Sequence, residues 1–421
     1  MTTGQLDAAA HPSTRPTNQV RARHVRVSVS LLALALGGFA IGTTEFASMG
    51  VLPDIATGLG VSIPTAGHAI TAYALGVVVG APVFAILGSR LPRKRLLLAL
   101  MAAITLANLA SAAAPTFGLF VAARFASGLP HGAYFGTCAL VAASLVPPQR
   151  RARAISMTIM GLTIANIVGV PLATLLGQTF GWRSAYATVV VIGVVTLVAL
   201  ELGVPRVAAS RGAGPRQELT ALRRPQVWLT LALGSIGFGG LFAVYSYITP
   251  TLTEVSGARA ATVPLVLAVF GSGMTLGNVI GGRLADWSVG RTLAGGLVAV
   301  IVVLLSFTVT AHALVPAVVT LFLLPLASGA MIPALISRLM DVAREGKSIG
   351  AALNHSALNV GNALGAWLGG LVIAAGLGYT APAVVGAGLA AGGLVVLALS
   401  YGLERRARRA QPRHSEPSRA A

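Results

Sequence analysis

The sequence predicts an all-α integral membrane protein with twelve transmembrane helices in two pseudo-symmetric six-helix bundles. Three observations support this prediction: the composition, the spacing of long apolar runs, and a repeat between the two halves. Apolar residues make up 55% of the 421 residues and charged residues only 10%. A soluble globular domain has a charged fraction near about 25%, so this composition leaves too little polar surface for one.

The chain contains twelve apolar runs that approach or exceed the roughly 20 residues a helix needs to cross a bilayer. Short polar or basic segments separate these runs. The predicted spans are 28–52, 66–88, 96–113, 117–145, 154–178, 184–204, 227–250, 262–283, 292–311, 314–338, 350–374 and 381–402.

The basic residues predict the orientation. With the amino terminus in the cytoplasm, 27 of the 30 lysines and arginines fall in cytoplasmic segments, as the positive-inside rule requires. Topology therefore accounts for the net charge of +19, and no nucleic-acid partner is expected. We expect the cytoplasmic (inner) membrane of a bacterium, with both termini cytoplasmic. The predicted parts are a disordered tail (1–27), a six-helix bundle (28–204), a linker (205–226), a second bundle (227–403) and a basic tail (404–421).

The two halves resemble each other. Asn166 and Gly169 recur 196 residues later as Asn362 and Gly365, and the loops after the second and eighth runs correspond at a similar offset. A duplicated six-helix unit in parallel orientation builds one large class of transporters, whose substrate site lies between the repeats near the bilayer midplane. The duplication therefore places any substrate site between the two bundles.

Glu45 is the carboxylate that lies in the interior of an apolar run. The other ten acidic residues fall in loops, in tails or at the ends of runs. A charged side chain at the bilayer centre costs at least about 2.5 to 3.5 kcal/mol on insertion scales, so such residues usually line a cavity and carry function. Glu45 is therefore the first functional candidate, with a purely structural pairing to another helix as the alternative.

Arg124 is the basic residue, histidines aside, that lies well inside a run. Arg124, Ser127, Gly128 and His131 step by three or four residues and share one helix face. Burial disfavours a charged carboxylate and a nearby cation favours it. If Glu45 and Arg124 share a cavity, Glu45 exchanges protons according to which side admits water. His131 joins this proton-coupling group because histidine ionises near neutral pH. The alternatives are structural: Arg124 holds helices together, and His131 is a neutral ring hydrogen-bonded between helices.

Aromatic and amide side chains predict a cavity for a small amphipathic organic substrate. The alternatives are lipid-facing aromatic rings and asparagines that bond a neighbouring helix. The candidate cavity residues are Tyr73, Phe238, Phe242, Tyr245, His355, Asn359 and Asn362.

The fifth run carries small residues at helical spacing, Gly161, Gly169 and Gly177, together with Pro171. Small residues let helices approach closely, and proline bends the helix axis. Close packing explains most glycines of this chain, whereas the combination of Gly169 and Pro171 indicates a flexing or sealing element.

Several chemistries are not expected. The chain has no phosphate-binding GxxxxGK[ST] motif, its seven histidines lack metal-ligand spacing, and it has one cysteine and no nucleophile elbow. We therefore predict that the protein is not an enzyme and holds neither a metal nor a cofactor. A proton gradient is the expected energy source.

The motifs in this sequence resemble the major facilitator superfamily, and within it the twelve-span drug/proton antiporters of the arabinose-efflux-like permease and chloramphenicol-efflux branch. The first span reads GTTEFASMGVLPDIA and the fourth reads RFASGLPHGA. The resemblance implies an acidic site at Glu45 and a role in proton coupling for Arg124. It also implies that Gly161, Gly169, Pro171 and Gly177 form the antiporter motif, which limits leak between the two faces.

The loop after the eighth run is similar to the family signature G-x-L-a-D-r-x-G-R, which Gly282, Leu284, Asp286, Gly290 and Arg291 meet with one inserted residue. The loop after the second run departs from it, with Ser89 in place of an aspartate and Pro92 in place of a glycine. The resemblance implies cytoplasmic gating contacts, and the departure puts the aspartate contact in doubt. The residues assigned to these gating loops are Arg90, Arg93, Asp286 and Arg291.

The sequence thus predicts a proton-coupled secondary active exporter, a drug or small-metabolite/H⁺ antiporter that works by alternating access as a monomer in the lipid bilayer. A sugar or metabolite permease on the same fold is the alternative. A non-transporting membrane sensor is a remote one, because the longest connection, 205–226, is too short for a folded soluble domain.

Overall fold

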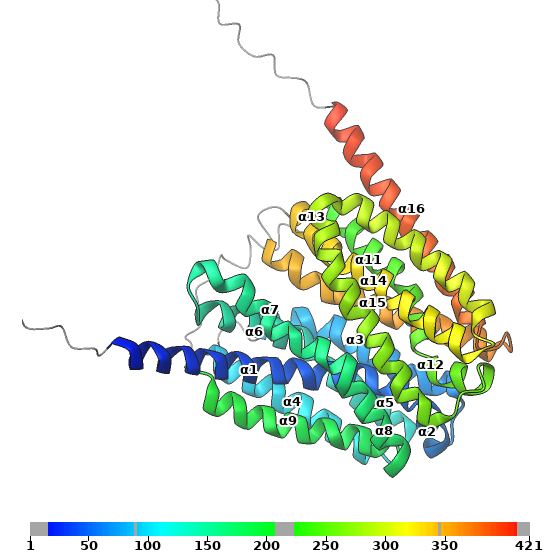
Figure 1. The fold of residues 1–421 in the computed structure, drawn as a ribbon, viewed down its shortest axis with the longest axis horizontal. Coiled ribbons are helices and arrows are strands. Elements are labelled where there is room, and N and C mark those ends of the chain that lie inside the picture. Colours follow the sequence, from blue (N-terminus) through cyan, green and yellow to red (C-terminus); the bar gives the residue numbers. More distant parts are fainter. Residues whose placement is uncertain (1–15, 88–90, 207–222, 344–346, 411–421) are drawn as a thin grey trace, which may run out of the picture.

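The computed structural model describes residues 16–87, 91–206, 223–343 and 347–410. Helices dominate these ranges, which contain no strand. The helices of the first half, blue to green, and those of the second half, green to red, form two groups that meet along a seam (Figure 1).

The first group holds six spans. Its helices are α1 (Pro16–Gly50), α2 (Leu52–Leu59), α3 (Ile63–Leu87), α4 (Arg93–Ala113), α5 (Phe117–Gly128), α6 (His131–Ser144), η2 (Pro148–Arg150), α7 (Arg151–Ile164), η3 (Ala165–Gly169), α8 (Val170–Phe180) and α9 (Arg183–Gly203).

The second group holds the other six. Its helices are α11 (Pro225–Tyr245), α12 (Ile248–Pro250), η5 (Thr251–Val255), η6 (Ala260–Thr262), α13 (Val263–Thr310), α14 (Leu314–Ala343), α15 (Lys347–Ala374) and α16 (Ala381–Ala410).

Ten helical stretches of the described chain are long and apolar enough to cross a membrane. One of them contains α13, which consists of two spans joined at Ser288, where the backbone turns to φ −165° and ψ 107°. Counting α13 as two spans gives eleven, and the fourth predicted span, 117–145, is the twelfth. It is not the single helix that the sequence predicted. It is divided into α5 and α6 at Leu129 and Pro130, where the proline ring removes one hydrogen bond of the helix.

Both outer helices extend further than the sequence predicted. Helix α1 begins at Pro16, so residues 16–27 are helical and not an irregular lead. Proline is well suited to the first position of a helix, where its missing N–H needs no partner. Helix α16 likewise continues to Ala410, into the predicted tail.

Backbone geometry supports the predicted duplication. Val51 ends the first span and Tyr247 ends the seventh; they are 196 residues apart and share φ −115° and ψ 22°. The helical segments that follow lead to Gly60 and Gly257, which both have a φ of 65°. A φ in this left-handed region favours glycine because a Cβ is strained there. The two halves therefore repeat the same break and turn.

The seam between the bundles is formed by two pairs of helices. Helix α3 packs along α15, and the η3–α8 part of the fifth span packs against α13. At the second pair, the Cα of Gly271 lies so close to the backbone of Asn166 that a side chain would not fit. The two contacts, of the second span with the eleventh and of the fifth with the eighth, are equivalent to each other, because the second span corresponds to the eighth and the fifth to the eleventh.

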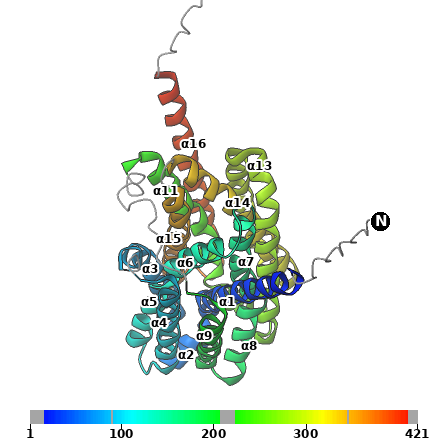
Figure 2. The same cartoon turned by 90° about the vertical axis from the view of Figure 1, so that its left-hand side faces the viewer.

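The bundles also meet at the end that we call the distal end, opposite the end where α1 begins and α16 finishes (the terminal end). In Figure 2, α2 lies at the distal end and the last turns of α16 project from the terminal end. The Thr249 hydroxyl lies 2.9 Å from the carbonyl oxygen of Met49 and 3.0 Å from that of Gly50. The breaks after the first and seventh spans thus close the distal end against each other.

Ion pairs at the terminal end lie inside the bundles. Lys94 at the start of α4 pairs with Glu201 of α9 at 3.1 Å, and Arg338 of α14 pairs with Glu404 of α16 at 2.8 Å. Within the described ranges no ion pair joins one bundle to the other. The ion pairs of the described residues therefore hold each bundle together at this end and do not join the two.

We expect Arg338→Ala to destabilise the second bundle. The Arg338 guanidinium donates to the Ser400 hydroxyl at 2.8 Å and to Glu404, and it stacks 4.1 Å from the Tyr401 ring. Losing hydrogen bonds to a charged group costs about 1.5 to 3 kcal/mol. Thermal unfolding of the purified protein measures this loss. Arg405→Ala, which removes an exposed neighbouring cation, is the control and should have little effect; equal effects would contradict the assignment.

Candidate functional site

Glu45 lies in the middle of α1, inside the protein. Its side chain is 6% exposed, so it does not face the lipid. It makes no hydrogen bond or ion pair with any residue that the structure describes. Arg124 is the cation that acts on it electrostatically, from beyond ion-pair distance. The structure therefore brings these two predicted residues near each other without pairing them.

Arg124 is wholly buried and is held by α1 and α4. Its Nη2 donates to the carbonyl oxygen of Thr44 at 2.7 Å, and its Nη1 donates to the Thr44 hydroxyl at 2.9 Å and to Oδ1 of Asn108 at 3.5 Å. The Asn108 amide in turn donates to the Ser127 hydroxyl at 3.1 Å. Arg124 is thus bonded to the residue that precedes Glu45, so its position and that of the carboxylate depend on each other.

Two tyrosine rings also flank the Arg124 guanidinium. Its central carbon lies 4.6 Å from the Tyr73 ring centroid and 5.2 Å from that of Tyr186. The Tyr186 hydroxyl lies 2.8 Å from that of Ser48, one turn of α1 beyond Thr44. A desolvated cation gains about 2 kcal/mol from an aromatic face. Neutral groups therefore surround the arginine, and Glu45 remains the nearby group able to balance its charge.

His131 connects this cluster to the other bundle. Its Nδ1 lies 3.0 Å from the Tyr73 hydroxyl, while its Nε2 is buried without a partner. Its ring centroid lies 5.8 Å from that of His355 in α15. The His355 ring also stacks on Phe135, with centroids 5.3 Å apart and planes within 6°. Two histidines from opposite bundles therefore face each other across the seam.

Aromatic side chains gather beside Glu45 where α1 meets α11 and α13. The Phe46 ring lies 6.5 Å from Phe242 and 5.6 Å from Tyr245, and Tyr245 stacks on Phe270 with centroids 4.0 Å apart. Phe238 is also buried, at 3% exposure. Three predicted cavity residues, Phe238, Phe242 and Tyr245, thus share one core between the bundles. Tyr73 instead belongs to the arginine cluster.

The predicted asparagines of α15 are buried with unused hydrogen-bonding capacity. Asn359 donates to the carbonyl oxygen of His355 at 3.0 Å, but its Oδ1 has no partner. Both amide atoms of Asn362 lack partners although the side chain is wholly buried. Buried polar groups are nearly always hydrogen-bonded in folded proteins. These amides therefore keep unused donors and acceptors in the interior of the protein.

The glycines of the fifth span pack against α1. Gly161 lies against the carbonyl oxygen of Ala35, Gly169 against the side chain of Thr43, and Gly177 against Val51. Residues 165–169 form one turn of π-helix directly before Pro171. Such turns occur mostly as single turns inside α-helices, frequently at functional sites. The glycines of the predicted antiporter motif therefore form the surface against which α1, the helix that carries Glu45, packs.

The predicted gating residues are not brought together. Arg90 lies outside the described residues. Arg93 is half-buried with its Nε unbonded, Asp286 is exposed without an ion pair in the described ranges, and Arg291 stacks over the Trp287 ring at 5.0 Å. The described charges of this set, Arg93, Asp286 and Arg291, therefore make no ion pair between the bundles.

Sequence reasoning missed several residues of the site. Thr44, Asn108 and Tyr186 hold Arg124, and Phe46, Phe135 and Phe270 complete the aromatic contacts. Asn108 gave a usable signal, since an amide inside an apolar run requires a partner. The tyrosine and phenylalanines gave none, because aromatic residues are common in spans. The described residues hold no group of three or more potential metal ligands.

The comparisons with known proteins agree on one family. The family model described as the Major Facilitator Superfamily matches residues 34–354. Inner membrane transport protein YdhP of Escherichia coli (strain K12) is 43% identical over 376 residues, which cover 89% of this chain and 97% of that protein. The chloramphenicol resistance protein of Streptomyces lividans is 33% identical over 356 residues, with coverages of 83% and 89%.

A solved structure agrees with the fold. The crystal structure of a bacterial homologue of the human lysosomal transporter Spinster, in an inward-facing and unoccupied conformation, has a TM-score of 0.70. The alignment covers 94% of this chain and 98% of that one, at 18% identity. At this identity the likeness concerns the fold alone.

We expect Gly161→Ala to destabilise the protein, because a Cβ at Gly161 would overlap the backbone of Ala35. Overpacking of this kind costs about 1 to 3 kcal/mol. Gly136→Ala in α6 is the matched control, since a Cβ there meets no atom within 4 Å. Thermal unfolding of both variants measures the difference. Equal unfolding midpoints would show that the fifth span does not pack on α1 as described.

Proposed function

Because the chain belongs to the Major Facilitator Superfamily and is a membrane transporter, we propose that it is a proton-coupled secondary active exporter. In this proposal a small amphipathic organic compound leaves the cell by alternating access while protons enter. The alternative is a sugar or metabolite permease on the same fold, importing or facilitating.

The observation that carries the proposal is the Glu45 carboxylate, buried between the bundles without a hydrogen-bond partner among the described residues. A charged carboxylate in such a place is costly unless water or a cation stabilises it. A protonated one carries a smaller cost, because it has no net charge to desolvate. Its protonation therefore changes the relative free energies of the two access states, and a difference of one pKa unit between those states supplies about 1.4 kcal/mol.

Arg124 and His131 support Glu45 in different ways. Arg124 fixes the backbone beside the carboxylate through Thr44 and supplies the positive charge that a deprotonated Glu45 balances. His131 meets the second bundle at His355, so a proton taken up there also changes the contact across the seam. Through these two residues, the protonation of side chains in the first bundle would affect how closely that bundle packs against the second.

The buried side chains between the bundles favour a neutral or weakly polar aromatic compound as the substrate. Phe46, Phe242 and Tyr245 supply flat apolar surfaces, while Asn359 and Asn362 supply unused hydrogen-bonding groups. Pockets for organic ligands combine these two features. The name of the Streptomyces relative, a chloramphenicol resistance protein, agrees with an exported compound of this kind.

We place the protein in the bacterial inner membrane with its terminal end in the cytoplasm. The inner membrane is named for the E. coli relative, and the basic residues concentrate in the segments of the terminal end. With that orientation, the contacts of Thr249 with α1 close the periplasmic side. The conformation described is then inward-facing, and the working unit is a monomer.

We expect Glu45→Gln to abolish proton-driven transport and to retain exchange without a gradient. A glutamine has the shape of a protonated glutamate but does not ionise. In proteoliposomes, pH-gradient-driven uptake or extrusion should fall at least about ten-fold, which corresponds to about 1.4 kcal/mol, while counterflow continues. Glu254→Gln, a change at an exposed carboxylate of the distal end, is the control.

The same assay separates exporter from permease. A facilitating permease would show wild-type counterflow and no dependence on the pH gradient in either protein. Undiminished gradient-driven transport by the Glu45→Gln variant would remove the residue from the coupling role.

We expect Arg124→Lys to lose transport although the charge is kept. Lysine lacks the planar fork that bonds both the carbonyl oxygen and the hydroxyl of Thr44, and it stacks less well between Tyr73 and Tyr186. Initial transport rates should fall about ten-fold or more at matched protein levels. Wild-type rates in this variant would show that charge alone suffices and that the fork is dispensable.

A further inference from the structure

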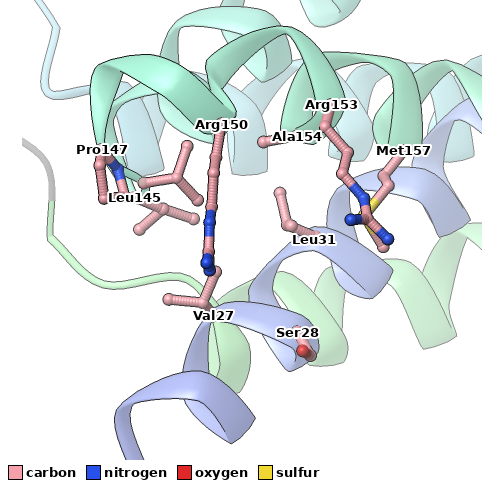
Figure 3. A pocket seen from close by; sticks show the side chains of 10 residues that line it. Val27, Ser28, Leu31, Leu145, Pro147, Arg150, Arg153, Ala154 and Met157 are labelled. Atoms are coloured by element: carbon pink, nitrogen blue, oxygen red, sulfur yellow. The ribbon is translucent and has the colours of Figure 1, made fainter. Parts of the chain in front are cut away.

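A pocket at the terminal end lies in the crevice between α1 and the start of α7, with a cavity volume of about 580 Å³. Arg150, in the turn before α7, reaches across it toward Val27 of α1, and the side chain of Arg153, from the first turn of α7, lies beside Met157 (Figure 3). Leu31 lies between these two walls. None of its lining residues is acidic. The pocket therefore combines two cations with an apolar floor.

The position of the pocket matches the level of lipid headgroups. Val27 begins the membrane-length stretch of α1, Leu145 follows the end of α6, and Arg151 begins α7. Three spans thus enter the hydrocarbon at this level. Basic pockets between spans at such a boundary bind anionic lipid headgroups.

An apolar stripe leads from the pocket along the fifth span. Met157 lines the pocket, and Met160 and Ile164 follow it on the same helix face. Their side chains are 38%, 51% and 46% exposed, respectively. Asn166, whose backbone abuts Gly271 of the other bundle, lies about half a turn away from Met157 around the helix. The stripe therefore points away from the seam, toward the lipid.

We propose that this pocket binds an anionic phospholipid, with the headgroup phosphate held by Arg150 and Arg153 and one acyl chain lying along Met157, Met160 and Ile164. The arginine fork matches the geometry of phosphate oxygens. The exposed stripe gives the acyl chain an apolar surface that an inorganic phosphate or a soluble phosphorylated metabolite would not use. The site is separate from Glu45 and does not depend on what the protein transports.

The test compares lipids on the full-length purified protein. Native mass spectrometry and thermal unfolding are measured with phosphatidylglycerol, with phosphatidylcholine and with inorganic phosphate. We expect the wild type to retain phosphatidylglycerol preferentially and to unfold at a higher temperature with it. Phosphatidylcholine and inorganic phosphate should give neither effect.

Variants locate the site. Arg150→Ala with Arg153→Ala should weaken phosphatidylglycerol retention about ten-fold or more, since each arginine near the surface contributes about five-fold. Arg151→Ala, which removes an exposed arginine outside the pocket, should retain it as the wild type does. All three side chains are exposed, so the variants should fold, and Arg150→Lys with Arg153→Lys should keep part of the binding.

Several outcomes would overturn the proposal. An equal loss in the Arg151→Ala variant would show a diffuse basic surface. A full effect of inorganic phosphate would show a soluble anion site without a role for the acyl chain. The absence of any lipid preference in the wild type would show that the protein's own chain fills the pocket or that it stays empty.

Discussion

The site depends on one buried interaction, the hydrogen bonds from the Arg124 guanidinium to the carbonyl oxygen and hydroxyl of Thr44. A guanidinium keeps its charge, so its burial requires that several neutral groups surround it. Asn108, Tyr73 and Tyr186 complete this set from three other helices. The first, second, third and sixth spans thus all contact the fourth span through Arg124. The backbone that carries Glu45 is fixed by the same bonds.

The glycine surface of the fifth span and the arginine cluster support α1 from two sides. Gly161 lets the backbone of α1 touch the fifth span, Gly169 makes room for the side chains of Thr43 and Phe39, and Thr44 is held by the arginine. The first helix of the second bundle has a corresponding support, since Gly365 lies against the backbone of Gly239 and Ala243. Each bundle therefore fixes the helix that faces its partner by close packing at small residues.

The sequence predicted most of the fold, because hydrophobic length and basic connections are read directly from the chain. It missed the division at Pro130 because the residues on both sides remain apolar, so the run looked continuous. The site was harder to predict. Glu45 and Arg124 stood out as charges among apolar residues, whereas Tyr186 became a partner of Arg124 only through the packing of distant helices. Proximity in space between such residues has no signature in one sequence.

The repeated break at Val51 and Tyr247 shows that the two halves share a backbone, but they do not share the acid. The residue 196 positions after Glu45 is Leu241, which is buried against the apolar core. A cycle that used this one carboxylate would carry a single positive charge inward. Exchange for a neutral compound would then be electrogenic and driven by the membrane voltage together with the pH gradient, whereas exchange for a monovalent cation would be electroneutral and would not respond to the voltage. In the proposed exporter, the duplicated scaffold with its unduplicated acid would thus limit each cycle to one proton, and the charge of the exported compound would decide whether the membrane voltage contributes.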